Sequence, residues 1–263
     1  MNIAIIGYGK MGKLLEVRAL ERGHQVVGIV EPYTLDKTSL SGSVICKTIA
    51  ELKEPDLGIE FTRPDTAVPN IKDLINRKIP VLVGTTGWYD QLDQVKQAVE
   101  NAGASLLWAS NFSLGVHLFY RIAGFAAKLA DPFPEYDVGG WEAHHNKKAD
   151  SPSGTAKTLV ERVLAEMTRK QKPVWEILQR PPAAEELHYP SLRLGSAPGI
   201  HTLIFDSPAD TIEITHTARN REGLVSGALT AAEWLLSCPR PGGPAGEARR
   251  GVFTIDDVLG SPL

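Results

Sequence analysis

The chain has little cysteine, no long apolar run and no excess of charge of either sign. It contains only two cysteines, Cys46 and Cys238, and no CxxC pair. Neither a disulfide framework nor a zinc site is therefore expected, and we expect no bound metal. No apolar run reaches the roughly 18 residues that cross a bilayer. We therefore expect no association with membranes.

The charge balance and the beginning of the chain exclude further classes of protein. The sequence has 28 basic and 31 acidic residues, which gives a net charge of −3. This balance provides no electrostatic attraction for nucleic acid or for an anionic membrane surface. The chain reaches Gly7 after a few apolar residues and has no basic segment before it, which is unlike a signal peptide. With 43% hydrophobic residues, a soluble cytoplasmic protein with a substantial core is expected.

The first 113 residues alternate between short apolar runs and amphipathic helical patterns. Repeated strand–helix units with apolar strands are typical of an α/β fold, in which helices cover both faces of a mostly parallel sheet. Ligands bind such sheets at the carboxyl ends of their strands. The expected strands are residues 2–6, 25–30, 56–62, 80–84 and 105–109.

A glycine-rich loop joins the first expected strand to the first expected helix. Residues 7–12 read G-x-G-x-x-G. In dinucleotide-binding folds the first glycine permits a tight turn, the second lets the backbone approach the pyrophosphate, and the third lets the helix pack on the strand. Glu31 ends the second strand, where a carboxylate accepts hydrogen bonds from ribose hydroxyls. The sequence therefore predicts a Rossmann-like dinucleotide site formed by Gly7, Tyr8, Gly9, Lys10, Met11, Gly12 and Glu31.

Glu31 also bears on which dinucleotide is bound. Its carboxylate would repel the 2′-phosphate of NADP, and Pro32 stands where an NADP-binding chain often has an arginine. NADH is therefore the expected cofactor. Lys10, Lys13 and Lys37 could still screen a phosphate, so use of NADPH also stays open.

The second half of the chain has a different pattern. Helices are expected at residues 114–129 and 154–168, with several strands between and after them. Consecutive strands after a helix indicate an α+β domain on an open mixed sheet, whose exposed edge can pair with another copy. A last helix at 224–236 and the tail 253–259 are expected to return to the first domain. The strands expected here are residues 137–144, 191–194, 200–205 and 211–217.

These patterns divide the chain into two domains. Residues 1–113, completed by 222–263, would form the dinucleotide-binding domain, and residues 114–221 would form the domain for substrate binding and oligomerisation. The stretch 239–246 is rich in proline and glycine and is expected to be a surface loop.

Residues 142–156 carry the strongest functional signal in the chain. Two histidines, two lysines and an acid precede a Ser-Gly-Thr turn that opens a helix. Imidazoles exchange protons near neutral pH, and ammonium groups hold carboxylates. The first turn of a helix presents free backbone N–H groups to an anion. Paired histidines at the end of a strand can also be purely structural, but the whole cluster predicts action on a small acidic molecule.

The order of the motifs resembles that of the 4-hydroxy-tetrahydrodipicolinate reductase family, nicotinamide-dependent enzymes of the diaminopimelate route to lysine. The resemblance covers nearly the whole chain, with Glu60 in place of the usual aspartate of a DFTRP segment. The matching segments are residues 7–12, 60–64, 84–87, 110–115 and 142–156.

The resemblance implies a reaction and an assembly. The substrate would be a small cyclic dicarboxylate that loses its hydroxyl as water and is then reduced by hydride. The family's second domain also mediates tetramerisation, so a homotetramer is expected.

The resemblance also implies roles for individual residues. His144 would be the proton donor and Lys148 the second catalytic residue. The substrate would contact His145 and the turn at Ser153, Gly154 and Thr155. The nicotinamide end of the cofactor would be lined by Gly84, Thr85, Thr86, Ser110, Asn111 and Phe112.

Two other functions stay open at this point. Another two-domain NAD(P)-dependent oxidoreductase acting on an alcohol would need a lysine or histidine that removes the alcohol's proton, and it would leave the Ser-Gly-Thr turn without a role. A non-catalytic NAD(H)-sensing protein would need only the first domain's site, and the histidine–lysine cluster argues against it.

Overall fold

A computed structural model describes residues 1–34, 38–237 and 248–260 of the chain. The chain divides into two compact units, which are Met1–Ser113 with Glu222–Leu263 (unit 1) and Leu114–Arg221 (unit 2). Lys37 and the expected loop at 239–246 lie outside the described residues. Within the described residues, no helix combines the length and apolar character needed to span a bilayer.

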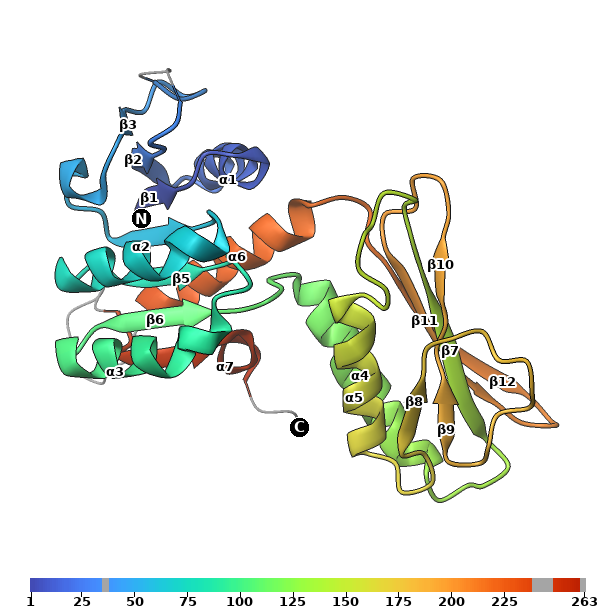
Figure 1. The fold of residues 1–263 in the computed structure, drawn as a ribbon. Helices are drawn as coiled ribbons and strands as arrows, with labels where there is room; N and C mark the ends of the chain where they lie inside the picture. Colours follow the sequence, from blue (N-terminus) through green and yellow to red (C-terminus); the bar gives the residue numbers. More distant parts are fainter. Residues whose placement is uncertain (35–37, 238–247, 261–263) are drawn as a thin grey trace. The chain divides into compact units, whose positions relative to one another are not determined.

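Unit 1 is built on a parallel sheet of seven strands in the described part of the chain (Figure 1). Their order is β13-β6-β5-β4-β1-β2-β3, and every neighbouring pair is parallel. The order reverses between β1 and β4, where ligands bind in such sheets. The Rossmann-like fold is therefore confirmed. The strands are β1 (Asn2–Ile6), β2 (Gln25–Val30), β3 (Ile45–Cys46), β4 (Leu57–Glu60), β5 (Val81–Val83), β6 (Ser105–Trp108) and β13 (Gly251–Thr254).

The helices of unit 1 begin and end at residues suited to those positions. α1 begins at Lys10, within the glycine-rich segment, and Gly23 follows its end with a φ of +78°, which favours glycine. α2 starts at Pro64, where the missing N–H costs no helical hydrogen bond. The helices are α1 (Lys10–Glu21), α2 (Pro64–Asn76), α3 (Leu92–Ala102), α6 (Glu222–Leu236) and α7 (Ile255–Leu259), with short turns η1 (Ile49–Glu51) and η2 (Tyr89–Gln91).

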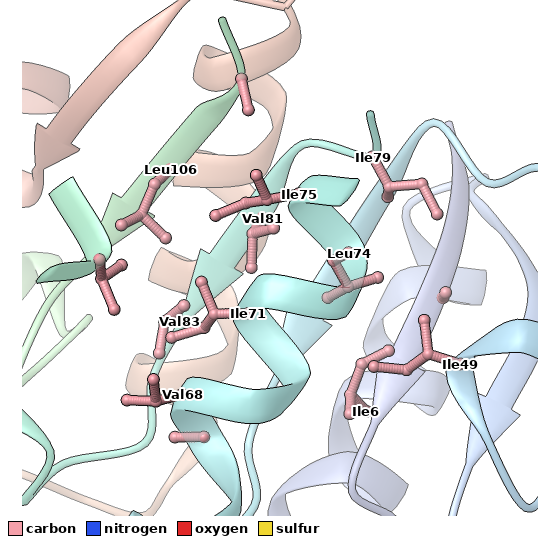
Figure 2. Packing of buried hydrophobic residues seen from close by; sticks show 14 of the residues in the cluster. Ile6, Ile49, Val68, Ile71, Leu74, Ile75, Ile79, Val81, Val83 and Leu106 are labelled. Atoms are coloured by element: carbon pink, nitrogen blue, oxygen red, sulfur yellow. The ribbon is translucent and has the colours of Figure 1, made fainter. Parts of the chain in front are cut away.

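A continuous apolar core holds α2 against the sheet. Figure 2 shows Ile71 and Ile75 of α2 beside Val81 and Val83 of β5. These side chains are almost completely buried, and β4 is buried along its whole length because helices cover both faces of the sheet. The close packing fixes the loops that follow β1, β4 and β5, and those loops carry the expected dinucleotide residues.

The end of the chain completes the sheet of unit 1. β13 pairs in parallel with β6, from Gly251 opposite Ser105 to Thr254 opposite Trp108. The end of the chain therefore lies in unit 1. The two-residue strand β3 was not expected, because two residues are too few to show a periodic pattern.

Unit 2 contains an open mixed sheet in the order β10-β7-β11-β12. β10 is parallel to β7, and the other two pairings are antiparallel. The expected mixed sheet is therefore confirmed, although the small parallel pair β8–β9 was not expected. The elements are α4 (Leu114–Ala130), β7 (Asp137–His144), α5 (Gly154–Ala165), β8 (Lys172–Val174), β9 (Glu186–His188), β10 (Ser191–Arg193), β11 (Ile200–Asp206) and β12 (Thr211–Thr217).

One face of this sheet forms a core with α4 and α5. Leu203 and Phe205 of β11 pack in one cluster with Phe119 of α4 and Leu159 of α5. Alternate residues of a strand share a face, so His201 lies on the same face as Leu203 and Phe205. This places a polar side chain at the end of an otherwise apolar row.

Candidate functional site

The glycine loop of unit 1 has no room for side chains at two of its three glycines. A Cβ on Gly7, whose φ is +92°, would lie 2.3 Å from the carbonyl oxygen of Phe61. A Cβ on Gly12 would lie 2.2 Å from the carbonyl oxygen of Gly7. At Gly9, by contrast, a Cβ would meet nothing within 4 Å. The fold therefore requires Gly7 and Gly12, whereas Gly9 keeps the backbone open to an approaching ligand.

Glu31 stands at the end of β2 and is tied to this loop. Its Oε2 accepts a hydrogen bond of 3.0 Å from the backbone N–H of Tyr8. Beside it lies a pocket of about 400 Å³ that opens next to Gly9. An open backbone, an anchored carboxylate and an adjacent pocket together fit the phosphate and ribose of a dinucleotide. Residues that line the pocket include Gly7, Gly9, Glu31, Lys47, Arg63 and Asp73.

A second pocket of unit 1, of about 260 Å³, gathers several of the residues expected at the nicotinamide end. It is lined by Met11, Gly84, Thr85 and Thr86, together with residues 61, 62 and 64. A Cβ on Gly84 would lie 2.0 Å from the ring of residue 61, so close packing requires a glycine at position 84.

Ser110, Asn111 and Phe112 do not line either of these two pockets. Asn111 Oδ1 accepts a hydrogen bond of 2.8 Å from the N–H of Ser113. Phe112 is buried, and its ring makes an edge contact with that of Phe61 at 6.4 Å. Phe112 is therefore a core residue in this structure, and the cofactor role of all three stays a prediction.

In unit 2, strand pairing gathers polar side chains from three strands. Glu142 and His144 are two residues apart on β7 and so share a face. His201 of β11 and Ser191 of β10 are the direct neighbours of Glu142 across the sheet. Ser153, the N-cap of α5, completes the cluster. Strand register and a helix start therefore bring together residues that are far apart in sequence.

The carboxylate of Glu142 is fully buried at the centre of this cluster. Its Oε1 accepts hydrogen bonds from the N–H of Ser153 (2.9 Å) and the hydroxyl of Ser191 (2.6 Å), and its Oε2 accepts one from the hydroxyl of Ser153. Burial alone would raise the pKa of Glu142, but these hydrogen bonds outweigh it and hold the pKa below its ordinary value. Glu142 is therefore an anion in the interior of unit 2.

His144 lies beside this carboxylate and is 12% exposed. Its Nδ1 is 3.4 Å from Glu142 Oε2. Its Nε2 faces Gly199, where a Cβ would come within 3.2 Å of that nitrogen. Burial lowers the pKa of His144; the charge of Glu142 opposes this change, and Lys148 adds to it. A protonated His144 therefore gives up its proton more readily than an ordinary histidine.

The other expected residues of unit 2 lie on the loop and turn that follow β7. Lys148 Nζ donates a hydrogen bond of 2.7 Å to Asp150 Oδ1, so its charge is already paired. His145 is exposed. The N–H of Ser153, expected to face the substrate, is donated to Glu142 instead.

The N–H groups of Gly154 and Thr155 have no protein acceptor among the described residues. They lie in the first turn of α5 and are therefore the two expected donors still open to an anion. Gly154 is also exposed, which leaves its backbone accessible to a ligand.

Sequence reasoning assigned no role to Glu142, Ser191, Gly199 or His201. The spacing of Glu142 and His144 along a predicted strand would have placed both on one face, but the partners on β10 and β11 depend on strand register. One oxygen of Glu142 and one nitrogen from each of His144 and His201 lie within 4.8 Å of one another, a spacing that a metal could also use. The three hydrogen bonds to Glu142 indicate a hydrogen-bonded cluster instead.

Comparison with known proteins shows which family the chain resembles. Models described as "Dihydrodipicolinate reductase, N-terminus" and "Dihydrodipicolinate reductase, C-terminus" match residues 1–112 and 115–259. A 4-hydroxy-tetrahydrodipicolinate reductase of Christiangramia forsetii is 35% identical over 259 residues and covers 98% of both chains. One of Staphylococcus aureus is 32% identical over 264 residues, which are 98% of this chain and 100% of the relative.

Solved structures share the fold. A dipicolinate-bound dihydrodipicolinate reductase from Paenisporosarcina sp. TG-14 matches with a TM-score of 0.75 and 22% identity over 97% of each chain. An amine dehydrogenase from Mycobacterium smegmatis matches with a TM-score of 0.59 and 11% identity over 97% of this chain and 95% of its own.

The contrast between Gly9 and Gly12 gives a test of the dinucleotide site. Gly9→Ala should leave the melting temperature unchanged, because its Cβ enters open space, but it should weaken NADH binding roughly tenfold or more, or about 1.4 kcal/mol. Gly12→Ala should instead lower the free energy of unfolding by about 1–3 kcal/mol, because its Cβ meets backbone. Calorimetric binding and thermal unfolding measure the two effects. Full NADH affinity in a folded Gly9→Ala protein would contradict the assignment.

Proposed function

Because the chain belongs to the dihydrodipicolinate reductase family, we propose that it reduces 4-hydroxy-tetrahydrodipicolinate to tetrahydrodipicolinate with NAD(P)H and loss of water. This is a step of the diaminopimelate route to lysine. Close relatives named for this activity align with almost the entire chain. The observation that carries the proposal is the pairing of His144 with buried Glu142, next to a helix start with open N–H groups. A proton donor and an anion site are what this reaction needs.

The cofactor site in this proposal is the glycine loop with Glu31 and the pockets beside it. A bound nicotinamide would supply the hydride. Gly9 would admit the pyrophosphate, and Glu31 would accept hydrogen bonds from the adenosine ribose. Since the carboxylate of Glu31 opposes a 2′-phosphate, NADH is the preferred cofactor and NADPH the poorer one.

The substrate site in this proposal is the start of α5. The N–H groups of Gly154 and Thr155 bind one carboxylate, aided by the positive end of the helix dipole. His145 and Lys148 contact the same dicarboxylate, and Ser153 supports the turn through Glu142 rather than touching the substrate. Dipicolinate, the small dicarboxylate bound to the Paenisporosarcina enzyme, agrees with a substrate of this charge.

The chemistry assigned to His144 is donation of a proton. Loss of the substrate's hydroxyl as water leaves a conjugated imine, and hydride adds to the ring carbon conjugated with it. The electron pair displaced by the hydride must be quenched by a proton, which His144 gives from Nε2. General acid catalysis of this kind is worth about 10²–10⁴ in rate.

Both rival functions fit the cluster less well. An enzyme that oxidises an alcohol needs a base and has no use for an anion-binding turn beside it. A sensor of NAD(H) has no use for an imidazole oriented by a buried carboxylate. Turnover of 4-hydroxy-tetrahydrodipicolinate, followed as NADH oxidation, separates the proposed enzyme from both rival functions.

The assembly that we propose is a homotetramer formed through unit 2. β12 is an edge strand, and its Ile212 is 52% exposed. α4 also exposes an apolar stripe with helical spacing. Edge strands and apolar faces of this kind favour pairing with another copy. The stripe consists of Leu118, Ile122, Phe125 and Leu129.

The first test concerns His144. His144→Gln should lower kcat about 10²–10⁴-fold, because the proton donor is lost. Dipicolinate affinity, measured by calorimetry, should change little, because the carboxylate donors stay in place. Lys147→Ala is the control, since this exposed lysine has no role in the proposal. Near-normal turnover in His144→Gln would remove the acid assignment.

The second test concerns the cofactor. The wild-type kcat/KM should be higher with NADH than with NADPH. Glu31→Gln should shift this ratio toward NADPH by roughly tenfold, or about 1.4 kcal/mol, because the repulsion of the 2′-phosphate is relieved. Asp73 lines the same pocket but belongs to α2, away from the end of β2. Asp73→Asn therefore removes a charge from the pocket and should leave the ratio of the two kcat/KM values unchanged. A preference for NADPH in the wild type would overturn the role given to Glu31.

The third test concerns assembly. Light scattering after size exclusion should give four times the 28.6 kDa mass of the chain. Ile212→Asp should lower that mass, because a charge on the edge strand opposes pairing. Ile177→Asp changes an equally apolar exposed residue outside the sheet and should not lower it. A monomer at micromolar concentration would contradict the proposed assembly.

A further inference from the structure

We propose that Glu142 is a positioning residue that acts through His144, with His201 as a second imidazole that competes for the same oxygen. The proposal rests on the proposed function, because it gives His144 the role of acid. In it, Glu142 Oε2 holds the Nδ1–H of His144 and leaves Nε2 to carry the proton that is transferred. Glu142 thereby couples the acid to the start of α5.

The hydrogen bonds to Glu142 leave only part of its carboxylate open to a histidine. A carboxylate offers about four acceptor positions. Ser153 occupies two positions of Glu142, and Ser191 occupies a third. One position therefore remains, and it belongs to Oε2.

Two imidazole nitrogens lie close to the remaining acceptor position of Glu142. His144 Nδ1 is 3.4 Å from Glu142 Oε2, and His201 Nδ1 is 3.8 Å from the same atom. Both nitrogens are buried and have no hydrogen-bond partner within the described residues. The two rings meet edge to face at 5.2 Å. Two donors thus face one remaining acceptor, and the nearer is His144.

Burial separates the two histidines. His201 is 3% exposed, and burial lowers its pKa to about 4, so it is neutral at physiological pH. His144 is less buried and lies nearer the carboxylate. The charge of Glu142 is therefore available to stabilise a protonated His144 rather than a protonated His201. A buried carboxylate that fixes the tautomer of a histidine is a common way to orient the other ring nitrogen.

The direction of the pH effect follows from the charges around His144. Glu142 on its own strand and Asp150 on the following loop favour the protonated ring, whereas Lys148, Arg193 of β10 and burial oppose it. Neutral His201 faces the ring from β11. An acid works only while it is protonated, so turnover should fall as the pH rises through the pKa of His144. Removal of the Glu142 charge lowers that pKa and moves the loss of activity to lower pH.

The experiment compares Glu142→Gln with wild type in two ways. Steady-state kinetics across pH should show the alkaline limb of kcat displaced to lower pH, with kcat reduced about 10–100-fold and KM changed much less. Nuclear magnetic resonance of ¹³C-labelled histidine, with the signal assigned through His144→Gln, should show the titration midpoint of His144 displaced in the same direction. The titration needs no turnover, so it tests the inference even if the proposed reaction is not catalysed.

Three further variants separate positioning from support of the fold. Glu142→Asp keeps the charge and should return the alkaline limb of the kcat–pH profile toward its wild-type pH. Ser191→Ala removes one hydrogen bond to Glu142 but keeps the charge, and it should leave the limb in place. His201→Phe should leave the limb in place or move it to higher pH, because it removes the competing donor.

Three results would overturn the inference. The first is an unchanged His144 titration in folded Glu142→Gln, which would leave Glu142 a purely structural role. The second is an equal displacement of the limb in Ser191→Ala. The third is loss of wild-type activity in a chelator with recovery on addition of zinc, because His144 Nδ1 would then be bound to metal. A wild-type protein that is inactive with 4-hydroxy-tetrahydrodipicolinate would contradict the proposed function but not this inference.

Discussion

A buried negative charge on Glu142 organises unit 2. An isolated carboxylate in a protein interior is costly, and this one is stabilised by hydrogen bonds from the start of α5 and from β10. Because those donors come from different elements, the carboxylate fixes their relative positions. It also leaves one acceptor position beside two imidazoles. The position of the proposed acid thus depends on how this charge is satisfied.

The two units differ in the local structure that leaves backbone N–H groups open to a charged ligand. Unit 1 relies on missing side chains: Gly7 and Gly12 permit a tight loop, and Gly9 leaves the backbone open. Unit 2 relies on a helix start whose N-cap, Ser153, is engaged by Glu142, so that the next N–H groups stay available. In both units backbone N–H groups would bind the proposed anion, and a packed core sets their positions.

Much of the fold could be predicted from the sequence because its pattern is local. β1, β2, β7 and β12 have the predicted bounds, since apolar runs and turn residues mark their ends. The glycine loop was predicted because its spacing has a direct physical meaning. β3 and the β8–β9 pair were missed because two or three residues carry no periodic signal and their pairing partners are distant in sequence.

The site was predictable only in part, for a related reason. His144 and Lys148 stand in one motif, whereas His201 reaches Glu142 through the register between β7 and β11. Ser153 shows the same limit: its position at a helix start was predicted, but its N–H donates to Glu142, which precedes it on another element. Hydrogen-bond partners set by tertiary packing do not show in the order of residues.

The most direct measurement of the central claim is a crystal structure of the chain with NADH and dipicolinate. The account predicts a dipicolinate carboxylate on the N–H groups of Gly154 and Thr155, with His144 Nδ1 on Glu142 and Nε2 facing the ring of the analogue. Dipicolinate bound away from the start of α5, or His144 turned so that Nδ1 faces the ligand, would contradict it.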